Sequence, residues 1–323
     1  MVFTDAAYVA RFNRVADYIE RNLATPLSLD QLAGVANFSK YHFHRLFQEH
    51  YGETLFQFVR RLRLERAASL LLANRSKPII EIAFDCGFEN ASAFSRSFRG
   101  HFGVSATEWR RIGGTKSQAE RMAAAGIDPH RNMTATWERY PLTTTFREGR
   151  RIWESDRQDG QRRVVTVRSF DTVDVAYVRH VGPYAADPGL FEKLFTELMN
   201  WAAAHDLVRF PMDTYCLVHD SSNVTAEHQL RISVCLAVPP GTQTGGAIGR
   251  LTLAAGTYAV LSQDVGPAEY GEAWSWAYSY WLPRSGYELA DRPAFEHYHV
   301  AGSDPCDPSY QRVNICLPVQ PAT

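Results

Sequence analysis

The spacing of hydrophobic and polar positions in the first third of the chain predicts a series of short amphipathic helices. A first helix is predicted by five apolar residues at helical spacing: Val9, Phe12, Ala16, Ile19 and Leu23. We expect Pro26 to end this helix. Ser28 followed by Gln31 is a capping-box pattern, so a second helix is predicted to begin there. Its buried stripe is expected to consist of Leu29, Leu32, Ala33 and Ala36.

Two copies of this pattern lie about fifty residues apart, and each predicts a helix-turn-helix motif. The turn falls at Asn37 in the first copy and at Gly87 in the second. Both residue types tolerate the left-handed backbone that such a turn requires. The helices after the turns are predicted to bury Phe43, Leu46 and Phe47 in the first copy, and Phe94, Phe98 and Phe102 in the second.

The polar faces of these two later helices are candidate DNA-reading surfaces. Residues at helical spacing outside the buried stripes are Tyr41, His44, Arg45 and Gln48 in the first copy, and Ala91, Ser92, Ser95, Arg96 and Arg99 in the second. Small residues at the start of the second reading helix allow a close approach to base edges. An arginine can donate two hydrogen bonds to guanine, so we expect both faces to enter the major groove.

A further helix is predicted between the two copies. Its buried stripe follows helical spacing at Leu64, Ala67, Ala68 and Leu71, and its other positions include Arg60, Arg61, Arg63 and Arg66. We expect this connector to set the distance between the reading helices. Its arginines have two interpretations, contact with DNA phosphates or pairing within the domain and with solvent.

The rear half of the chain is an internal duplication that follows a connecting stretch. Residues 113–162 are interpreted chiefly as a linker, with a helix over residues 118–125 and a short strand over residues 134–140. The repeated segments are Val181-Gly182-Pro183 with Val265-Gly266-Pro267, Arg231 to Leu236 with Arg312 to Leu317, and Cys216 to His219 with Phe295 to Tyr298. Each half is predicted to contain two strands, a helix and two more strands. Two fused halves suggest a groove along their pseudo-twofold axis.

A carboxylate among aromatic residues is the most informative feature of this duplication. In the predicted strand around Glu296, alternation puts Glu296 and Tyr298 on one face. In the alignment of the two halves, the position equivalent to Glu296 in the first half is Leu217. The second helix carries Tyr270, Trp274, Tyr278 and Trp281 on one broad face. Such an aromatic face is also typical of core packing. The alternative interpretation of Glu296 is a structural side chain that is exposed or paired with an arginine. Rings around an acid can bind a lipophilic cation.

Composition and charge restrict the function classes. The 323 residues are 45% hydrophobic and 21% charged, which is typical of globular domains. Residues 1–112 hold 15 basic and 11 acidic side chains, a net +4, whereas residues 164–323 hold 9 and 17, a net −8. The basic front favours a polyanion, although an ordinary solvated surface is the alternative. The absence of a signal peptide or a long apolar run predicts a cytoplasmic protein with no membrane partner.

No metal, cofactor or catalytic residue is predicted. The five cysteines are scattered without CxxC spacing, which indicates small buried residues. His42 and His44 lie two apart on a predicted helix, where they cannot share a metal ion, and His297 and His299 lack a third partner at ligand spacing.

The front of the chain resembles the AraC/XylS family of transcription regulators over about residues 8–112. The match rests on Ile79-x-x-Ile82-Ala83-x-x-x-Gly87-Phe88, then Phe94-Ser95-Arg96-x-Phe98-Arg99-x-x-Phe102-Gly103, and Trp109-Arg110. The resemblance implies a monomeric module whose two recognition helices enter successive major grooves, with Tyr41, His44, Arg45, Ala91, Ser92, Ser95 and Arg96 as base readers. Asn37 and Ala106 depart from the glycine and proline common in that family.

The rear resembles the GyrI-like ligand-binding domain over about residues 163–319. The match rests on Gly182-Pro183-Tyr184, Gly256-Thr257-Tyr258, Trp281-Leu282-Pro283-x-Ser285-Gly286-Tyr287-Glu288 and Arg292-Pro293-Ala294-Phe295-Glu296-x-Tyr298. In that family the matching acid lines a pocket for hydrophobic, often cationic, molecules, and Rob-type regulators join such a domain to an AraC-type reader. Some members are hydrolases that use a glutamate and an aromatic hydroxyl. Gln311 stands where relatives often carry an aromatic residue.

These observations predict a multidomain protein. We expect an all-α, homeodomain-like double helix-turn-helix domain at residues 1–112, a linker at 113–162, and an α+β GyrI-like domain of two similar halves at 163–323. The leading interpretation is a regulator that binds double-stranded DNA and a small lipophilic or cationic effector, whose occupancy alters engagement of DNA or RNA polymerase. The ligand site is expected at Glu296, lined by Tyr258, Tyr270, Trp274, Tyr278, Trp281 and Tyr298. The alternatives are a hydrolase with Glu296 as general base and a protein-interaction module.

Overall fold

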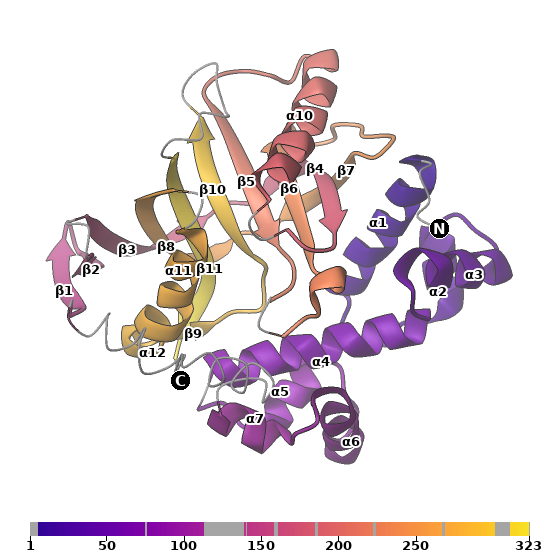
Figure 1. The fold of residues 1–323 in the computed structure, drawn as a ribbon, viewed down its shortest axis with the longest axis horizontal. Helices are drawn as coiled ribbons and strands as arrows, with labels where there is room; N and C mark the ends of the chain where they lie inside the picture. The colour runs from indigo at the N-terminus through magenta and orange to yellow at the C-terminus, as the bar shows by residue number, and fades with distance from the viewer. Residues whose placement is uncertain are drawn as a thin grey trace. The chain divides into compact units, whose positions relative to one another are not determined.

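The computed structural model divides the chain into two compact units. It describes residues 6–74, 76–112, 139, 141–157, 161–184, 187–221, 224–266, 269–300 and 311–322. The first unit is built on Met1–Gln118, and the second on the chain that follows, apart from two segments, Ser221–Thr225 and Gln243–Gly249, which belong to the first. Figure 1 shows that the front third of the chain is helical and that the remainder is built around a sheet. The expected helix over residues 118–125 and strand over 134–140 lie outside the described residues, except for residue 139.

The helices of the first unit follow the predicted order of two helix-turn-helix motifs joined by a long helix. They are α1 (Ala6–Arg21), α2 (Leu29–Val35), α3 (Lys40–Tyr51), α4 (Leu55–Ala73), α5 (Ile79–Asp85), α6 (Ala91–Phe102) and α7 (Ala106–Ile112). The first core gathers Phe12, Ala16 and Ile19 of α1 with Phe43 and Phe47 of α3, all fully buried. The helical spacing of apolar residues therefore predicts both the helices and their buried faces.

Two details at the helix ends differ from expectation. Helix α1 ends at Arg21, before Pro26, because the chain turns where the Asn22 side chain donates to the Tyr18 carbonyl oxygen at 2.8 Å. Ser28 caps α2 by accepting from the Gln31 amide N–H at 3.2 Å, but the Gln31 side chain donates to the Tyr18 hydroxyl. The capping box of α2 is therefore only half formed.

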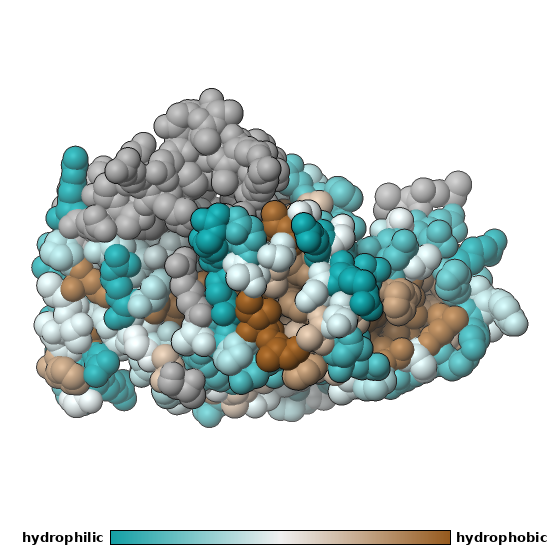
Figure 2. All heavy atoms as spheres, turned by 90° about the horizontal axis from the view of Figure 1, so that it is seen from below, coloured by the Kyte–Doolittle hydropathy of each residue, from teal (hydrophilic) through white to brown (hydrophobic). Residues whose placement is uncertain are grey.

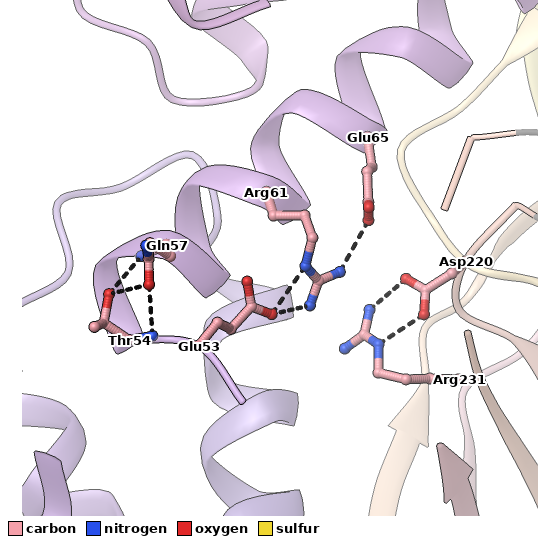
Figure 3. Close-up of polar contacts among 7 residues, drawn as sticks. All are labelled: Glu53, Thr54, Gln57, Arg61, Glu65, Asp220 and Arg231. Carbon is pink, nitrogen blue, oxygen red and sulfur yellow. Dashed lines mark hydrogen bonds and ion pairs between the residues drawn. The ribbon is translucent and has the colours of Figure 1, made fainter. Parts of the chain in front are cut away.

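A complete capping box begins the connector α4 instead (Figure 3). The Thr54 hydroxyl accepts from the Gln57 backbone N–H at 3.3 Å, and the Gln57 side chain accepts from the Thr54 backbone N–H at 2.9 Å. Two N–H groups that a helix start leaves without partners are thereby satisfied.

Both turn residues adopt the left-handed backbone predicted for them. The φ angle is 53° at Asn37 and 83° at Gly87. The equivalence of the motifs extends further, because α3 and α6 have 12 residues each and end at left-handed glycines, Gly52 and Gly103. The two motifs therefore share one backbone plan.

The second motif has its own core beneath α4 and α7. Phe94 and Phe98 of α6 are buried with Ala68 and Leu71 of α4. Trp109 of α7 is fully buried, and its indole N–H donates to the Ala68 carbonyl oxygen at 3.1 Å. Phe102 is only half-buried but packs against this core.

The arginines of the connector serve mainly internal contacts. Arg61 is buried between Glu53 and Glu65, donating to them at 2.6 and 3.1 Å (Figure 3). Arg63 donates to the Leu23 and Thr25 carbonyl oxygens. The phosphate interpretation is therefore wrong for these two residues. Arg60 is exposed and Arg66 is half-buried.

In the described part of the chain, the second unit is an 11-stranded sheet with helices. Its strands before the second half of the duplication are β1 (Thr143–Arg147), β2 (Arg150–Asp156), β3 (Arg162–Phe170), β4 (Val173–Val181), β5 (Met212–Val218) and β6 (Arg231–Ala237). The later strands are β7 (Gly249–Leu253), β8 (Gly256–Val265), β9 (Tyr287–Leu289), β10 (Ala294–Val300) and β11 (Gln311–Pro321). The helical segments are α10 (Pro188–Ala204), η1 (Glu227–Gln229), α11 (Tyr270–Trp276), η2 (Ala277–Trp281) and α12 (Leu282–Ser285).

The strand order reveals how the duplicated halves combine. Outward from the central antiparallel pair β10 and β5, the order is β11, β8, β3 on one side and β6, β4, β7 on the other. The first strand of each half, β3 or β7, thus lies beside the second strand of the other half. The halves are interlocked through the exchange of their first strands, and the order of the repeated strands is symmetric about the β10–β5 pair (Figure 1).

The expectation that residues 113–162 serve chiefly as a linker does not hold for its described later part. Strands β1 and β2 form an antiparallel hairpin, and β2 pairs with β3, so they extend the sheet. The sequence pattern concealed this hairpin because β1 is almost wholly exposed and its polar residues do not alternate with apolar ones.

The two faces of the sheet have different coverings. Side chains of directly paired residues share a face, so Glu296 lies with Cys216 and Ile315, whereas Phe295 lies opposite with Leu217 and Cys316. We call these the Glu296 face and the Phe295 face. Among the described residues, the core cluster on the Phe295 face consists of strand residues. Helix α11 lies over the Glu296 face, because its Trp274 contacts Glu296.

Large exposed hydrophobic side chains are few among the described residues. They are Tyr41, Phe56, Ile80, Phe84, Phe146, Val181 and Phe210. Figure 2 shows that the hydrophobic areas on the face it presents are separated by hydrophilic residues. In the described part of the chain, no helix is long and apolar enough to cross a membrane.

Candidate functional sites

The predicted DNA-reading residues all lie on the exposed faces of α3 and α6. Tyr41 at the start of α3 is 89% exposed, and exposed side chains follow it along that face at His44, Arg45 and Gln48. On α6 the exposed residues are Ala91, Ser92, Ser95, Arg96 and Arg99. Within each motif the reading face and the buried face therefore lie on opposite sides of one helix.

Local contacts hold the reading helices in place. The Asn90 side chain caps α6 by accepting from the Ala93 N–H at 2.8 Å, so the small exposed residues lie in the first turns after a fixed helix start. Helix α3 begins after Ser39 without a side-chain cap, and Lys40 pairs with Asp30 of α2 at 2.8 Å. Both helices are anchored through their buried phenylalanines, and their polar faces are exposed.

The ligand site predicted in the second unit is centred on Glu296 of β10. Glu296 is only 7% exposed, and its carboxylate accepts from the Trp274 indole N–H and from the Tyr298 hydroxyl, both at 2.8 Å. Tyr298 also lies 3.3 Å from the Tyr270 hydroxyl. Tyr278 stacks on Trp274 with ring centroids 5.9 Å apart. The structure therefore brings together five of the seven predicted ligand-site residues.

The other two lie elsewhere. Tyr258 lies on the Phe295 face, where its ring packs 5.0 Å from that of Phe295. Trp281 closes the π-helical segment η2, and the wider turn shifts it out of the α-helical register that the sequence spacing assumed. It packs edge-on against Trp153 of β2 at 5.5 Å. The grouping of these two residues with Glu296 is therefore corrected.

The pairing of the strands also corrects the symmetry partner of Glu296. Val234 and Ile315 are equivalent in the repeated segments, and they pair with Cys216 and Glu296, respectively. The counterpart of Glu296 is therefore Cys216, its direct partner across the central strand pair. Leu217, the partner expected from sequence, lies on the opposite face.

Two residues of this site were not among the predicted ones. One is Tyr184, which follows β4. Burial raises the pKa of its phenol, and nearby Cys216 and Glu296 add to that shift. The motif Gly182-Pro183-Tyr184 was a usable signal for it. Cys216 itself is buried beside Glu296, and burial raises the pKa of its thiol. No sequence signal pointed to Cys216, because its role depends on strand register.

The electrostatics of the site depend on an acid without a cationic partner. Burial raises the pKa of Glu296, and the hydrogen bonds from Trp274 and Tyr298 oppose that shift. Among the described residues, Glu296 forms no ion pair with lysine, arginine or histidine. A buried carboxylate in this condition is stabilised by any cation that reaches it.

This pKa shift predicts a pH dependence with opposite signs for stability and binding. Because the folded-state pKa is raised, protonated Glu296 contributes stability that is fully present below the unfolded pKa and lost as the pH rises through the folded value. Affinity for a lipophilic cation should instead fall as the pH is lowered through that value. Thermal unfolding and fluorescence titration across pH measure both. A cation affinity that stays constant over this range in the wild type would contradict the assignment.

Other polar groups of the unit serve as internal contacts. Asp213 accepts hydrogen bonds from His297 and His299 at 2.9 Å each, so the two histidines share one carboxylate as their partner. In the described part of the chain, no group of three or more His, Cys, Asp or Glu side chains could hold a metal ion. The four described cysteines are buried thiols.

Together, the two exposed reading helices and the Glu296 site define a DNA-binding helix-turn-helix regulator with a small-molecule-binding domain. Residues 32–112 match the helix-turn-helix domain family, and residues 164–320 match the GyrI-like small molecule binding domain family. Relatives include the multiple antibiotic resistance protein MarA of Escherichia coli, 32% identical over 107 residues, which are 33% of this chain and 81% of MarA. The chain belongs to the AraC/XylS family of transcription regulators.

Two further similarities concern the same part of the chain. The probable transcriptional regulator LumQ of Photobacterium leiognathi is 37% identical over 112 residues, which are 34% of this chain and 45% of LumQ. The chain thus spans about half the length of that relative. A solved AraC-type regulator from Chromobacterium violaceum is 32% identical, with a TM-score of 0.31, covering 32% of this chain and 91% of that one. The family matches and the sequence similarity to MarA support the regulator interpretation over the hydrolase alternative.

Proposed function

We propose that the protein regulates transcription by inserting α3 and α6 into the major groove of double-stranded DNA. The base-reading residues would be Tyr41, His44, Arg45, Gln48, Ala91, Ser92, Ser95 and Arg96. The observation that supports this assignment most strongly is the matched pair of motifs, each with a left-handed turn and an exposed polar face. Two such helices read successive grooves when they are spaced by about one helical turn, roughly 34 Å.

Arg96 provides the test of the DNA-reading face. Replacing Arg96 by Ala should weaken binding to a selected DNA site by about 1–3 kcal/mol and relax the preference for one base pair, because a bidentate contact to guanine is lost. Fluorescence anisotropy with the selected duplex and with single-base variants measures both effects.

The matched control is Arg99→Ala, which removes an equal charge from the same helix one turn later. If Arg99 contacts only phosphate, its loss weakens binding to all duplexes similarly. Equal base preference in Arg96→Ala and the wild type would show that Arg96 does not read a base.

We propose further that the second unit binds a small lipophilic cation at Glu296. The supporting observation is the buried carboxylate, which two neutral donors hold and no described cation neutralises. Tyr270, Trp274, Tyr278 and Tyr298 would supply aromatic faces for the cation, with Tyr184 added from the first half. Two duplicated halves would thus form one site, with the acid at their axis and its counterpart replaced by Cys216.

Ligand occupancy would alter how the protein engages DNA or RNA polymerase in the cytoplasm. Such coupling requires the ligand to bind two states with different affinities, because equal affinity shifts no equilibrium. A thermal-shift comparison of tetraphenylphosphonium with neutral triphenylphosphine oxide tests the binding step. Repeating DNA titrations with saturating cation tests the coupling, and an unchanged DNA affinity would restrict the output to polymerase contacts.

A further inference from the structure

Three segments of the first unit meet at the guanidinium of Arg63, in the middle of the connector α4. The Nε of Arg63 donates to the Leu23 carbonyl oxygen at 2.9 Å, and its Nη2 donates to the Thr25 carbonyl oxygen at 2.8 Å. Both carbonyls belong to the turn that follows α1. Arg63 therefore binds the turn between α1 and α2 through two donors of one planar guanidinium group.

The turn of the second motif packs against the same place. A Cβ atom added at Gly87 would lie 2.7 Å from the Leu23 carbonyl oxygen and 3.0 Å from both the Ala24 Cα and the Arg63 Cζ. Real Cβ atoms do not approach backbone this closely, so the contact requires glycine. The turn of the second motif thus contacts the turn that follows α1, whose core packs against α3 of the first motif, in addition to the connection through α4.

The equivalent turn of the first motif lacks this requirement. Asn37 has the same left-handed backbone but carries a side chain, and its carbonyl oxygen accepts from Arg11 at 3.2 Å. Asparagine tolerates the left-handed backbone, so this turn accepts a residue other than the family's usual glycine. At Gly87 the close contact with Leu23, Ala24 and Arg63 adds a requirement for glycine.

An ion pair between Arg61 and Glu53 also connects the end of the first motif to α4. Arg61 donates through Nε and Nη2 to Glu53, which follows α3, at 2.9 and 2.6 Å. This ion pair is largely buried. Rotation of α3 about the start of α4 would break it, so the first reading helix is held by contacts on both sides of the connector.

We propose that Arg63 and Gly87 form a clamp that fixes the separation of the two reading helices and thereby makes the protein select DNA by half-site spacing. The inference rests on the proposed DNA binding and names the residues that set its geometry. Inserting one base pair between half-sites displaces them by about 3.4 Å and rotates them by about 34°. A clamped pair of helices cannot follow that change, whereas a pair joined only by a helix can adjust.

The experiment compares one duplex with its spacing variants. The probe is a duplex that the wild-type protein selects from a random pool, together with the same duplex carrying one base pair more or less between its half-sites. Dissociation constants come from anisotropy of the labelled duplexes. The variants are Arg63→Ala and Arg63→Lys, which keeps the charge but loses the planar fork. Arg60→Ala is the matched control, because Arg60 is exposed on the same helix.

We expect the wild type to prefer its selected spacing by at least about tenfold, and both Arg63 variants to reduce that ratio by about tenfold. Arg60→Ala should weaken binding to all duplexes alike and preserve the ratio. The clamp is wrong if folded Arg63→Ala or Arg63→Lys retains the wild-type ratio. If Arg63→Ala does not fold by circular dichroism, Arg63→Lys decides the result. If the wild type selects no duplex at all, the proposed DNA binding fails first.

Discussion

Replacing Asp220 by Asn is expected to lower the free energy of unfolding by about 3–5 kcal/mol, because it removes the carboxylate that pairs with the buried guanidinium of Arg231. Asp220 accepts from Nε and Nη2 of Arg231 at 2.7 and 2.6 Å (Figure 3). The two side chains are only 4% and 2% exposed. Since Asp220 follows β5 and Arg231 begins β6, the pair closes the hairpin that carries Cys216.

Urea denaturation followed by tryptophan fluorescence measures this effect. Six of the seven tryptophans lie after residue 118, so the signal reports chiefly on the second unit. The matched control is Asp206→Asn, since the Asp206–Arg209 pair is almost fully exposed and should contribute little.

Equal stability of the two variants would contradict the assignment. A double variant, Asp220→Leu with Arg231→Met, should recover much of the loss, because apolar replacement of both partners removes the uncompensated charge.

Replacing Glu296 by Gln is expected to weaken binding of a lipophilic cation by about 2–5 kcal/mol, which is roughly 30-fold or more in Kd. Glutamine has the same length and removes the negative charge. Its amide oxygen can still accept from the Trp274 indole N–H, and its amide nitrogen can donate to the Tyr298 hydroxyl oxygen. At a pH above the folded-state pKa of Glu296, the ligand-free variant should be more stable than the wild type, because the buried carboxylate no longer opposes folding. Isothermal titration with tetraphenylphosphonium and a thermal melt without ligand measure the two effects.

Two controls separate charge from shape. Triphenylphosphine oxide has a similar size without the charge, so its affinity should change little in Glu296→Gln. Glu288→Gln removes another buried carboxylate, on β9, where Glu288 accepts from Gln320 at 2.7 Å, and it should leave cation binding unchanged. Equal losses for the cation and the neutral compound would indicate that the site has collapsed.

Local sequence patterns predicted the first unit well. The stripe of Phe43, Leu46 and Phe47, the turns at Asn37 and Gly87, and the exposed reading faces all depend on spacings of a few residues. Such patterns act through helix geometry and backbone sterics, which need no distant partner. The internal contacts of Arg61 and Arg63 could not be predicted from the sequence, because the positions of their acceptors Glu53, Leu23 and Thr25 depend on how the helices pack.

In the second unit, the sequence pattern predicts the strands and helix of each half and the acid, but it does not reveal the β1–β2 hairpin and it misplaces several neighbours of the acid. Glu296 and Tyr298 share a face because alternation along one strand is local. Tyr258 was grouped with them, although it lies on the other face. Trp281 was grouped by α-helical spacing, but the π-helical turn of η2 breaks that spacing.

The amino-acid sequence determined the duplicated motifs, their left-handed turns and the presence of an acid among aromatic residues, because each follows from short-range spacing and residue chemistry. Tertiary structure decided which residue meets that acid. A shift of one residue in strand register moves every side chain to the opposite face, and only the pairing of β5 with β10 sets Cys216, rather than Leu217, beside Glu296. The contact of Gly87 with Leu23 is likewise non-local, since it depends on how α4 holds the two motifs together.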